Sequence, residues 1–194
     1  MIRKSELVRD ESGATLVEFA LVVPALMALL MGLFDVGYNM YAKAILEGAM
    51  QEAGRNSTIE AADTGTIDAA VTAQVRKALP NASISYARQA YADFSDVNRP
   101  EEYKDVNGDG TCNAGEPFTD ANGNGVWDLD RGAAGAGGAK DAVVLTATIT
   151  YDRLFPVAAF IPGIPREYRS SSSTVLRNQP YDINETVPAT EECV

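Results

Sequence analysis

The sequence of 194 residues contains no histidine, only two cysteines and only one tryptophan. The absence of histidine excludes Ser-His-Asp triads, histidine-ligated zinc and imidazole proton shuttles. Basic residues are also scarce, because 16 Lys and Arg stand against 27 Asp and Glu, giving a formal net charge of −11. A nucleic-acid-binding protein needs a basic surface, so we expect no nucleic-acid partner. Neither cysteine has a histidine to activate it, which argues against cysteine catalysis and against an enzyme.

One long apolar segment dominates the N-terminal part of the chain. No charged side chain occurs from Phe19 to Phe34, and the run extends back to Ala14 with Glu18 as its single interruption. As a helix this stretch measures about 31 Å, which matches a hydrocarbon core of about 30 Å. We therefore predict a transmembrane segment over residues 14–36, rather than a buried core helix or a removable signal peptide.

The residues on either side of this segment predict its orientation. The basic residues Arg3, Lys4 and Arg9 precede the apolar run. Positive charges before a first span favour a cytoplasmic N-terminus. Residues 37–194 are then expected to form an extracytoplasmic α+β domain.

The start of the apolar run carries a second pattern. Gly13 directly precedes the run, and Glu18 is the fifth residue after that glycine. An ionisable group inside a membrane helix is costly and normally has a partner and a purpose. Over Glu11 to Pro24 the sequence resembles the type IV prepilins and, among them, the TadE-like pseudopilins of tight-adherence pili.

This resemblance implies a processing site and an assembly residue. A membrane-embedded prepilin peptidase is expected to remove residues 1–13 as a leader, cutting between Gly13 and Ala14. Glu18 is then expected to recruit the subunit into the pilus. The resemblance does not separate a TadE role from a TadF or TadG role.

Apolar periodicity predicts an α+β fold for the rest of the chain. The long pilin-like helix continues to about residue 55, and a second, shorter helix is expected over residues 66–78. Alternating patterns predict strands over residues 82–91, 141–151 and 169–177, which fit a small antiparallel sheet of three or four strands. The proline-rich stretch 154–165 is expected to be a loop capping the core, with contact to the bilayer or a partner as the alternative.

An oxygen-rich calcium-loop insertion is predicted over residues 101–138. Its first part fits the pattern D-x-[DN]-x-[DN]-G-x5-E, in which oxygens at positions one, three, five, seven and twelve bind Ca²⁺. A second loop repeats the opening but has Arg131 at position twelve, and it resembles dockerin-like calcium repeats. We therefore expect Ca²⁺, with Mg²⁺ less favoured, rather than plain Asn-Gly turns. The predicted ligands are Asp105, Asn107, Asp109, Thr111 through its carbonyl, Glu116, Asp120, Asn122, Asn124 and Asp128.

The two cysteines lie far apart in sequence. Cys112 falls inside the first predicted calcium loop, and Cys193 is the penultimate residue. Outside the cytoplasm they can form a disulfide, with two free thiols as the alternative.

Together these features predict a minor pilin or pseudopilin subunit for assembly of a tight-adherence pilus, with an outer domain stabilised by calcium. We expect it in the bacterial inner membrane as a single-pass protein with a periplasmic domain, or incorporated into an extracellular pilus. Its partners would be other pilin or pseudopilin subunits, the inner-membrane assembly platform and the prepilin peptidase. The main alternative is an unprocessed, membrane-anchored, calcium-dependent adhesion or binding module. A periplasmic metal-dependent enzyme is less favoured, because the clustered acids fall in calcium spacing.

Overall fold

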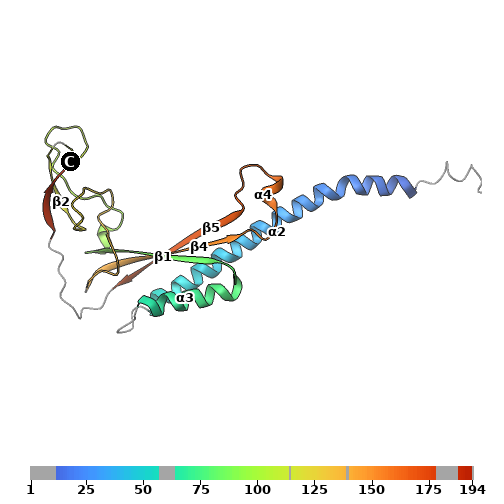
Figure 1. Ribbon diagram of the computed structural model, residues 1–194, viewed down its shortest axis with the longest axis horizontal. Coiled ribbons are helices and arrows are strands. Elements are labelled where there is room, and N and C mark those ends of the chain that lie inside the picture. Colours follow the sequence, from blue (N-terminus) through green and yellow to red (C-terminus); the bar gives the residue numbers. More distant parts are fainter. Residues whose placement is uncertain (1–11, 57–63, 114, 139, 178–187, 194) are drawn as a thin grey trace, which may run out of the picture. The chain divides into compact units, whose positions relative to one another are not determined.

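The computed structural model describes residues 12–56, 64–113, 115–138, 140–177 and 188–193 (Figure 1). The chain forms two compact units, residues 1–41 with 152–168 and residues 42–151 with 169–194, and each is described by itself. Most of the predicted leader, residues 1–11, lies outside the described residues. The predicted division into leader, transmembrane segment and outer domain stays a prediction.

The long predicted helix is present as α2 (Ser12–Asn56), which is 45 residues long. In the first unit its large apolar side chains are exposed, including Phe19 at 68% and Leu21 at 75%. The same unit contains the segment that follows β4, with the single helical turn α4 (Val157–Phe160). A helix that is apolar on all sides and uncovered by protein is typical of a membrane span.

The second unit contains an antiparallel sheet with the strand order β3-β1-β4-β5. Strand β1 pairs antiparallel with both β3 and β4, and its register places Ser83 opposite Thr150. The α+β class predicted from sequence is thereby confirmed. The four strands are β1 (Ser83–Tyr91), β3 (Ala133–Ala134), β4 (Ala142–Asp152) and β5 (Glu167–Arg177).

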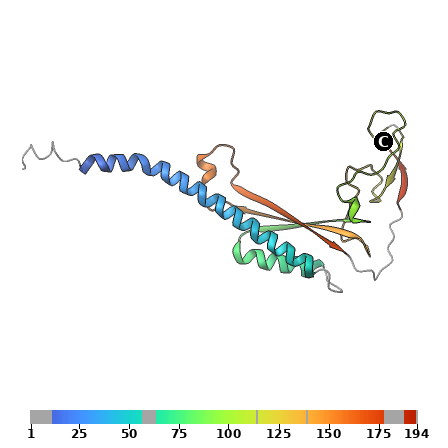
Figure 2. The same cartoon turned by 180° about the vertical axis from the view of Figure 1, so that it is seen from behind.

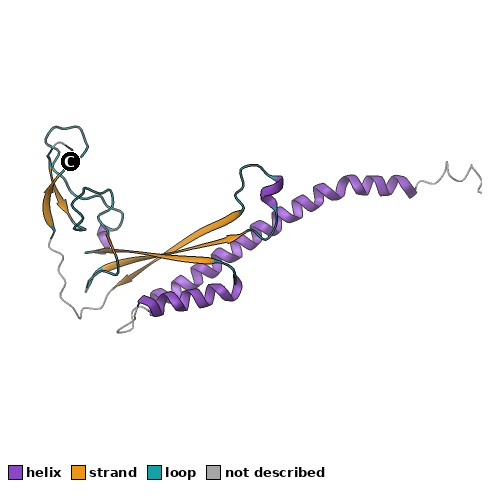
Figure 3. Ribbon diagram, viewed as in Figure 1, coloured by secondary structure: helices purple, strands orange, loops and turns teal. Residues whose placement is uncertain are grey.

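Helices cover this sheet and close its core (Figures 2 and 3). Helix α3 (Thr64–Ala78) runs beside the second half of α2, and Gly54 of α2 lies so close to β5 that a Cβ there would sit 2.8 Å from Thr174 Oγ1. Burial of these apolar faces is the main stabilising contribution to the unit. The core is built from Ala42, Leu46, Ala49, Met50 and Ala53 of α2, Ile67, Val71 and Val75 of α3, and Val143, Leu145, Ala147, Ile149 and Tyr151 of β4.

A second, two-stranded sheet was not anticipated from the sequence. Strand β2 (Pro117–Asp120) pairs antiparallel with β6 (Ala189–Glu192), so the end of the chain returns to the middle of the insertion. A short 3₁₀ turn, η1 (Phe94–Asp96), precedes the insertion. Apart from these elements the insertion is mostly loop (Figure 3).

One local expectation needs correction, and one polar side chain is unexpectedly buried. Asn39 of α2 is only 7% exposed, and its amide donates a hydrogen bond to the Asp35 carboxylate. The stretch 154–165 was expected to cap the core, yet within it Leu154 and Phe160 are mostly exposed while Val157 is buried. The apolar side chains of this loop therefore largely face outward.

Candidate functional site

The predicted processing and assembly residues all lie at the start of α2. Gly13 and Ala14 are in its first turn, and they and Glu18 are exposed. Ala14 and Glu18 are four residues apart on a helix, so they lie on one face about one turn apart. A charged group at residue 14 would therefore be a neighbour of the Glu18 carboxylate.

Among the described residues, one helix is long and apolar enough to cross a membrane, and it covers Gly13–Arg55. No residue of its most apolar 18-residue window is buried in the structure. A core helix of a soluble protein would be covered by protein over the same length. The helix therefore has the properties of a single-pass membrane anchor.

A buried ion pair lies at the end of this apolar stretch. Arg153 forms a salt bridge with Asp35, whose residue exposure is only 4%, and Asn39 donates a second hydrogen bond to the same carboxylate oxygen at 3.1 Å. The Arg153 guanidinium also stacks 5.6 Å from the centre of the Tyr168 ring. The other oxygen of Asp35 is buried without a hydrogen-bond partner among the described residues. Sequence reasoning missed this pair because its members are 118 residues apart.

The first predicted calcium loop folds around the carboxylate of Asp105. One oxygen accepts a hydrogen bond from the N–H of Gly108 at 2.5 Å, and the other accepts one from Gly110 at 2.9 Å. Both glycines have φ near +78°, a left-handed conformation that glycine adopts without a steric penalty. The loop is therefore wound tightly at positions four and six.

Asp109, at position five of the first loop, is held by its own neighbours. Its carboxylate accepts hydrogen bonds from the Thr111 hydroxyl at 2.6 Å and from the Asn113 amide at 2.8 Å. These bonds, led by the one from Thr111, stabilise the charged form and lower the pKa of Asp109 to about 2. The carboxylate is therefore ionised at neutral pH.

The second loop repeats this geometry position by position. Asp120 accepts hydrogen bonds from the N–H groups of Gly123 at 2.7 Å and Gly125 at 2.8 Å, and both glycines again have positive φ. Asn122 and Asn124 follow at the same spacing as Asn107 and Asp109 of the first loop, and their amides both donate to Asp128. The repeat predicted from the sequence therefore exists as a structural repeat.

Glu116, at position twelve, closes the first loop. One of its oxygens accepts a hydrogen bond from the N–H of Val106 at 2.7 Å, and the other accepts one from Asn113 at 3.3 Å. Val106 and Asn113 occupy positions two and nine of the loop. The Glu116 side chain thus ties the two ends of the loop together, and the residue is only 3% exposed.

Glu101 closes the second loop in the same way, although it precedes that loop in the chain. Its oxygens accept hydrogen bonds from the N–H groups of Ala121 at 2.7 Å and Asp128 at 3.1 Å, which are positions two and nine of the second loop. Glu101 is only 2% exposed. Arg131, which occupies position twelve by sequence, instead pairs with Asp96 at 3.2 Å. No local spacing rule reveals Glu101, because it is 27 residues from Asp128.

The chemistry of the donor set suits a hard cation, since carboxylate and amide oxygens are the ligands that Ca²⁺ prefers. Within the described residues, no Lys or Arg pairs with the loop carboxylates. Their oxygens bond to the loops themselves, and no three or more His, Cys, Asp or Glu side chains are gathered where a metal would sit. Binding of Ca²⁺ by these carboxylates would therefore require their side chains to rotate. The carboxylates concerned are those of Asp105, Asp109 and Glu116 in the first loop and Glu101, Asp120 and Asp128 in the second.

The C-terminus is attached to the first loop. Cys112 and Cys193 form a disulfide with their Cα atoms 5.5 Å apart. The backbone of Cys193 also donates to the Glu116 carbonyl at 2.8 Å and accepts from the Gly115 N–H at 3.0 Å. The disulfide and the β2–β6 pairing thus hold the same two chain segments together.

In the part of the chain that the structure describes, these features define an α+β protein with one N-terminal helix suited to anchoring it in a membrane. Residues 13–55 match the family model described as TadE-like protein. The resemblance to TadE-like proteins noted in the sequence is therefore confirmed over this segment. The match covers most of α2 and leaves the predicted calcium-loop insertion outside it. No curated protein and no solved structure matches the chain.

Proposed function

We propose that this protein is a minor pilin or pseudopilin subunit that is processed after Gly13 and takes part in assembly of a tight-adherence pilus. The TadE-like match over residues 13–55, on an apolar helix without protein cover, carries the proposal. N-terminal sequencing and intact mass of the protein from its native host test it. Recovery of a mature chain beginning at Ala14 is expected, and recovery of Met1 with the whole leader attached would contradict processing.

Glu18 is the residue we assign to assembly. Cleavage before Ala14 creates a cationic α-amine, and the Glu18 carboxylate lies on the same helix face one turn away. Pairing between these groups, within one subunit or with a neighbour, offsets the cost of holding a carboxylate in a membrane helix. The Glu18→Ala variant should insert into the membrane but fail to enter the pilus. Glu52→Ala, at an exposed acid of the same helix, is the matched control.

We further propose that Ca²⁺ stabilises the insertion. The two loops share one hydrogen-bonding pattern, and each contains three carboxylates that pair with no Lys or Arg among the described residues. A cation that binds only the folded state must raise the melting temperature. Calcium titration of the purified full chain is expected to raise its Tm, and an Asp105→Ala/Glu116→Ala variant should lose most of the effect. An unchanged Tm at millimolar calcium would contradict this part of the proposal.

The competing function is a membrane-anchored adhesion or binding module that is never processed. The predicted calcium-loop insertion favours this binding function, because the insertion lies outside the TadE-like match and so is not accounted for by the resemblance to that family. The two functions differ in two observable outcomes. Only the pilin function requires loss of residues 1–13 and co-purification of the protein with pili.

A further inference from the structure

We propose that residues 152–168 dock on the surface of the bilayer that α2 enters, and that a pocket in this segment holds a zwitterionic phospholipid headgroup. The proposal depends on membrane anchoring by α2, as described above. It adds a second membrane contact, made by a segment remote from the helix in sequence. All residues that carry it belong to the first compact unit.

The segment exposes more apolar surface than a loop in water normally does. Leu154 is 62% exposed, Phe160 is 66% exposed and Ile161 is 47% exposed. The large apolar side chains of α2 in the same unit are likewise exposed. Several large apolar side chains exposed in one short segment indicate a site of contact with a membrane or a protein.

The position of the segment along α2 identifies the membrane as the occupant. The ring of Phe155 stacks on that of Phe34, with ring centroids 6.2 Å apart. Phe34 is the last residue of the uncharged run, so it lies where a helix of about 31 Å leaves a hydrocarbon core of about 30 Å. Trp and Tyr side chains are enriched at this depth, where acyl chains meet headgroups, and Tyr168 belongs to the same segment. The segment is therefore held at the height of the headgroups.

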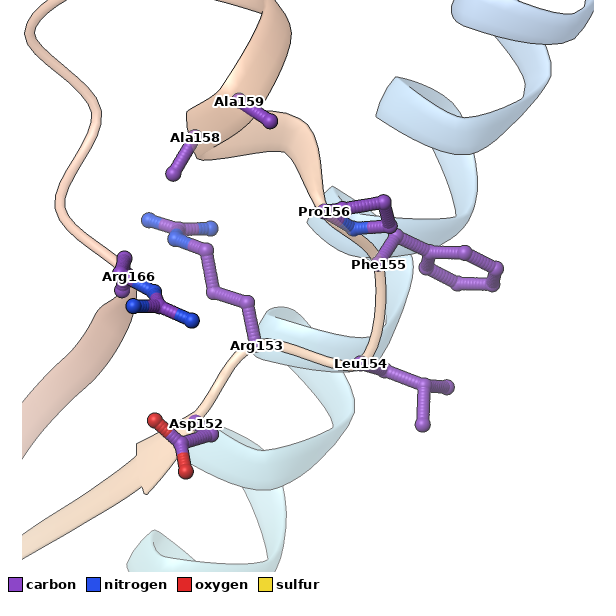
Figure 4. A pocket seen from close by; sticks show the side chains of 8 residues that line it. All are labelled: Asp152, Arg153, Leu154, Phe155, Pro156, Ala158, Ala159 and Arg166. Atoms are coloured by element: carbon purple, nitrogen blue, oxygen red, sulfur yellow. The ribbon is translucent and has the colours of Figure 1, made fainter.

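A pocket of about 540 Å³ lies in this segment (Figure 4). The Arg153 and Arg166 side chains extend into the space beneath the α4 turn, while Leu154 and Phe155 point to the other side. The pocket is therefore polar on the side where the arginines lie and continuous with apolar side chains on the other. Its lining residues are Asp152, Arg153, Leu154, Phe155, Pro156, Ala158, Ala159 and Arg166.

The charges in the pocket specify the class of headgroup. Arg153 is neutralised by Asp35, and its Nε donates to the Pro165 carbonyl at 2.9 Å. Arg166 and Asp152 also line the pocket, and within the described residues they form no ion pair with each other. The Arg166 guanidinium complements the phosphate of a zwitterionic headgroup, and the Asp152 carboxylate complements its ammonium group. An anionic headgroup would leave Asp152 uncompensated.

Depth-dependent fluorescence quenching tests the proposal on the full chain. A Trp127→Phe chain removes the native tryptophan, and Phe160→Trp then supplies a single probe at the exposed apolar tip. The protein is reconstituted in vesicles of phosphatidylethanolamine and phosphatidylcholine whose acyl chains are brominated near the headgroup. The Phe160→Trp probe should lose emission in brominated vesicles and shift to the blue. Leu29→Trp in the same Trp127→Phe chain reports insertion of α2. The unaltered chain, whose one tryptophan is Trp127, gives the background level of quenching.

Each pattern of quenching decides the proposal. Quenching of both probes supports it, and Arg166→Ala should then weaken quenching of the Phe160→Trp probe while Arg177→Ala, at an exposed arginine of β5, does not. Quenching of the Leu29→Trp probe alone overturns docking and leaves the anchor intact, whereas quenching of neither overturns both. Quenching that requires phosphatidylglycerol overturns the zwitterionic assignment. An unquenched Phe160→Trp probe that crosslinks to a second copy overturns the proposal in favour of a subunit contact.

Discussion

Glu101 occupies in the second loop the place that Glu116 occupies in the first, since each glutamate accepts hydrogen bonds from the N–H groups at positions two and nine. Glu116 is the last position of its own loop, whereas Glu101 precedes its loop by 19 residues of sequence, counted from Glu101 to Asp120. The two loops therefore have equivalent closures from different parts of the chain. A sequence motif describes only the first of them.

This equivalence predicts that the second loop depends on Glu101. Glu101→Gln exchanges a carboxylate oxygen for an amide that cannot accept from the buried N–H, which costs about 1–3 kcal/mol of unfolding free energy. If calcium binds both loops, calorimetric titration should show that the Glu101→Gln variant binds about half as many calcium ions as the unaltered chain. The Glu116→Gln variant should show the same reduction.

The neighbouring Glu102→Gln provides the control, because the Glu102 side chain is 83% exposed. It should leave both stability and calcium stoichiometry unchanged. Equal behaviour of the Glu101 and Glu102 variants would contradict the role assigned to Glu101.

The disulfide is predicted to make a large contribution to stability. Cys112 and Cys193 are 81 residues apart, and closing a loop of this length in the unfolded chain is worth about 4–5 kcal/mol in the chain-entropy description. A Cys112→Ser/Cys193→Ser variant should therefore unfold at lower urea concentration, and reductant should have the same effect on the native chain. The double variant itself serves as the control, since reductant should no longer affect it. Identical urea midpoints for the two chains would contradict the prediction.

The Asp35–Arg153 pair is predicted to be costly to break and cheap to replace. Asp35→Ala leaves the Arg153 guanidinium without its buried partner, which costs about 3–5 kcal/mol, whereas Asp35→Leu/Arg153→Met removes both charges and should cost much less. Thermal unfolding in detergent measures both.

An exposed pair on the same helix gives the comparison. Lys43 and Glu47 are 3.7 Å apart with both side chains about half exposed, so Lys43→Ala should cost only about 0.3–0.5 kcal/mol. A similar cost for Asp35→Ala would show that the first pair is not buried in solution.

Tyr86 is predicted to make stability dependent on alkaline pH. Its hydroxyl donates to the Asp68 carbonyl at 2.9 Å, and burial raises the pKa of Tyr86 above its ordinary value of 10. Because the pKa is raised in the folded state, the stabilisation is complete below about pH 10 and is lost as the pH rises through the folded-state value. Tyr86→Phe should cost about 1 kcal/mol at neutral pH and reduce the alkaline loss. Urea unfolding at neutral and alkaline pH checks this, and an unchanged alkaline loss in the variant would contradict it.

The elements that the sequence predicted are those with a local pattern. Helix α3 and strand β4 follow from apolar periods of about four and two residues, and their buried positions are those that the periods select. The predicted helix from residue 14 to 55 matches α2 within two residues at its start and one at its end. Periodicity over many residues is therefore sufficient for these elements.

The features that escaped prediction depend on residues far apart in the chain. Strands β2 and β6 have four residues each, too few for a visible alternation, and they become strands by pairing with each other. Asn39 is a polar residue that local sequence gives no reason to bury. It is buried beside Asp35, which forms a salt bridge with Arg153, a residue far away in the chain. Glu101 likewise has no motif of its own. Long-range pairing of this kind leaves no mark on local periodicity.

The disulfide also determines how the protein would respond to mechanical force. When a chain is pulled between its membrane helix and its C-terminal residue, tension passes directly through the bond from Cys112 to Cys193. The 80 residues between them (113–192), which include β4 and β5, are shielded from extension, and at about 3.5 Å per residue this hides about 280 Å of chain. Strand β1 and both long helices remain on the loaded path. A protein linked in this way therefore extends under force by less than its full chain length would allow.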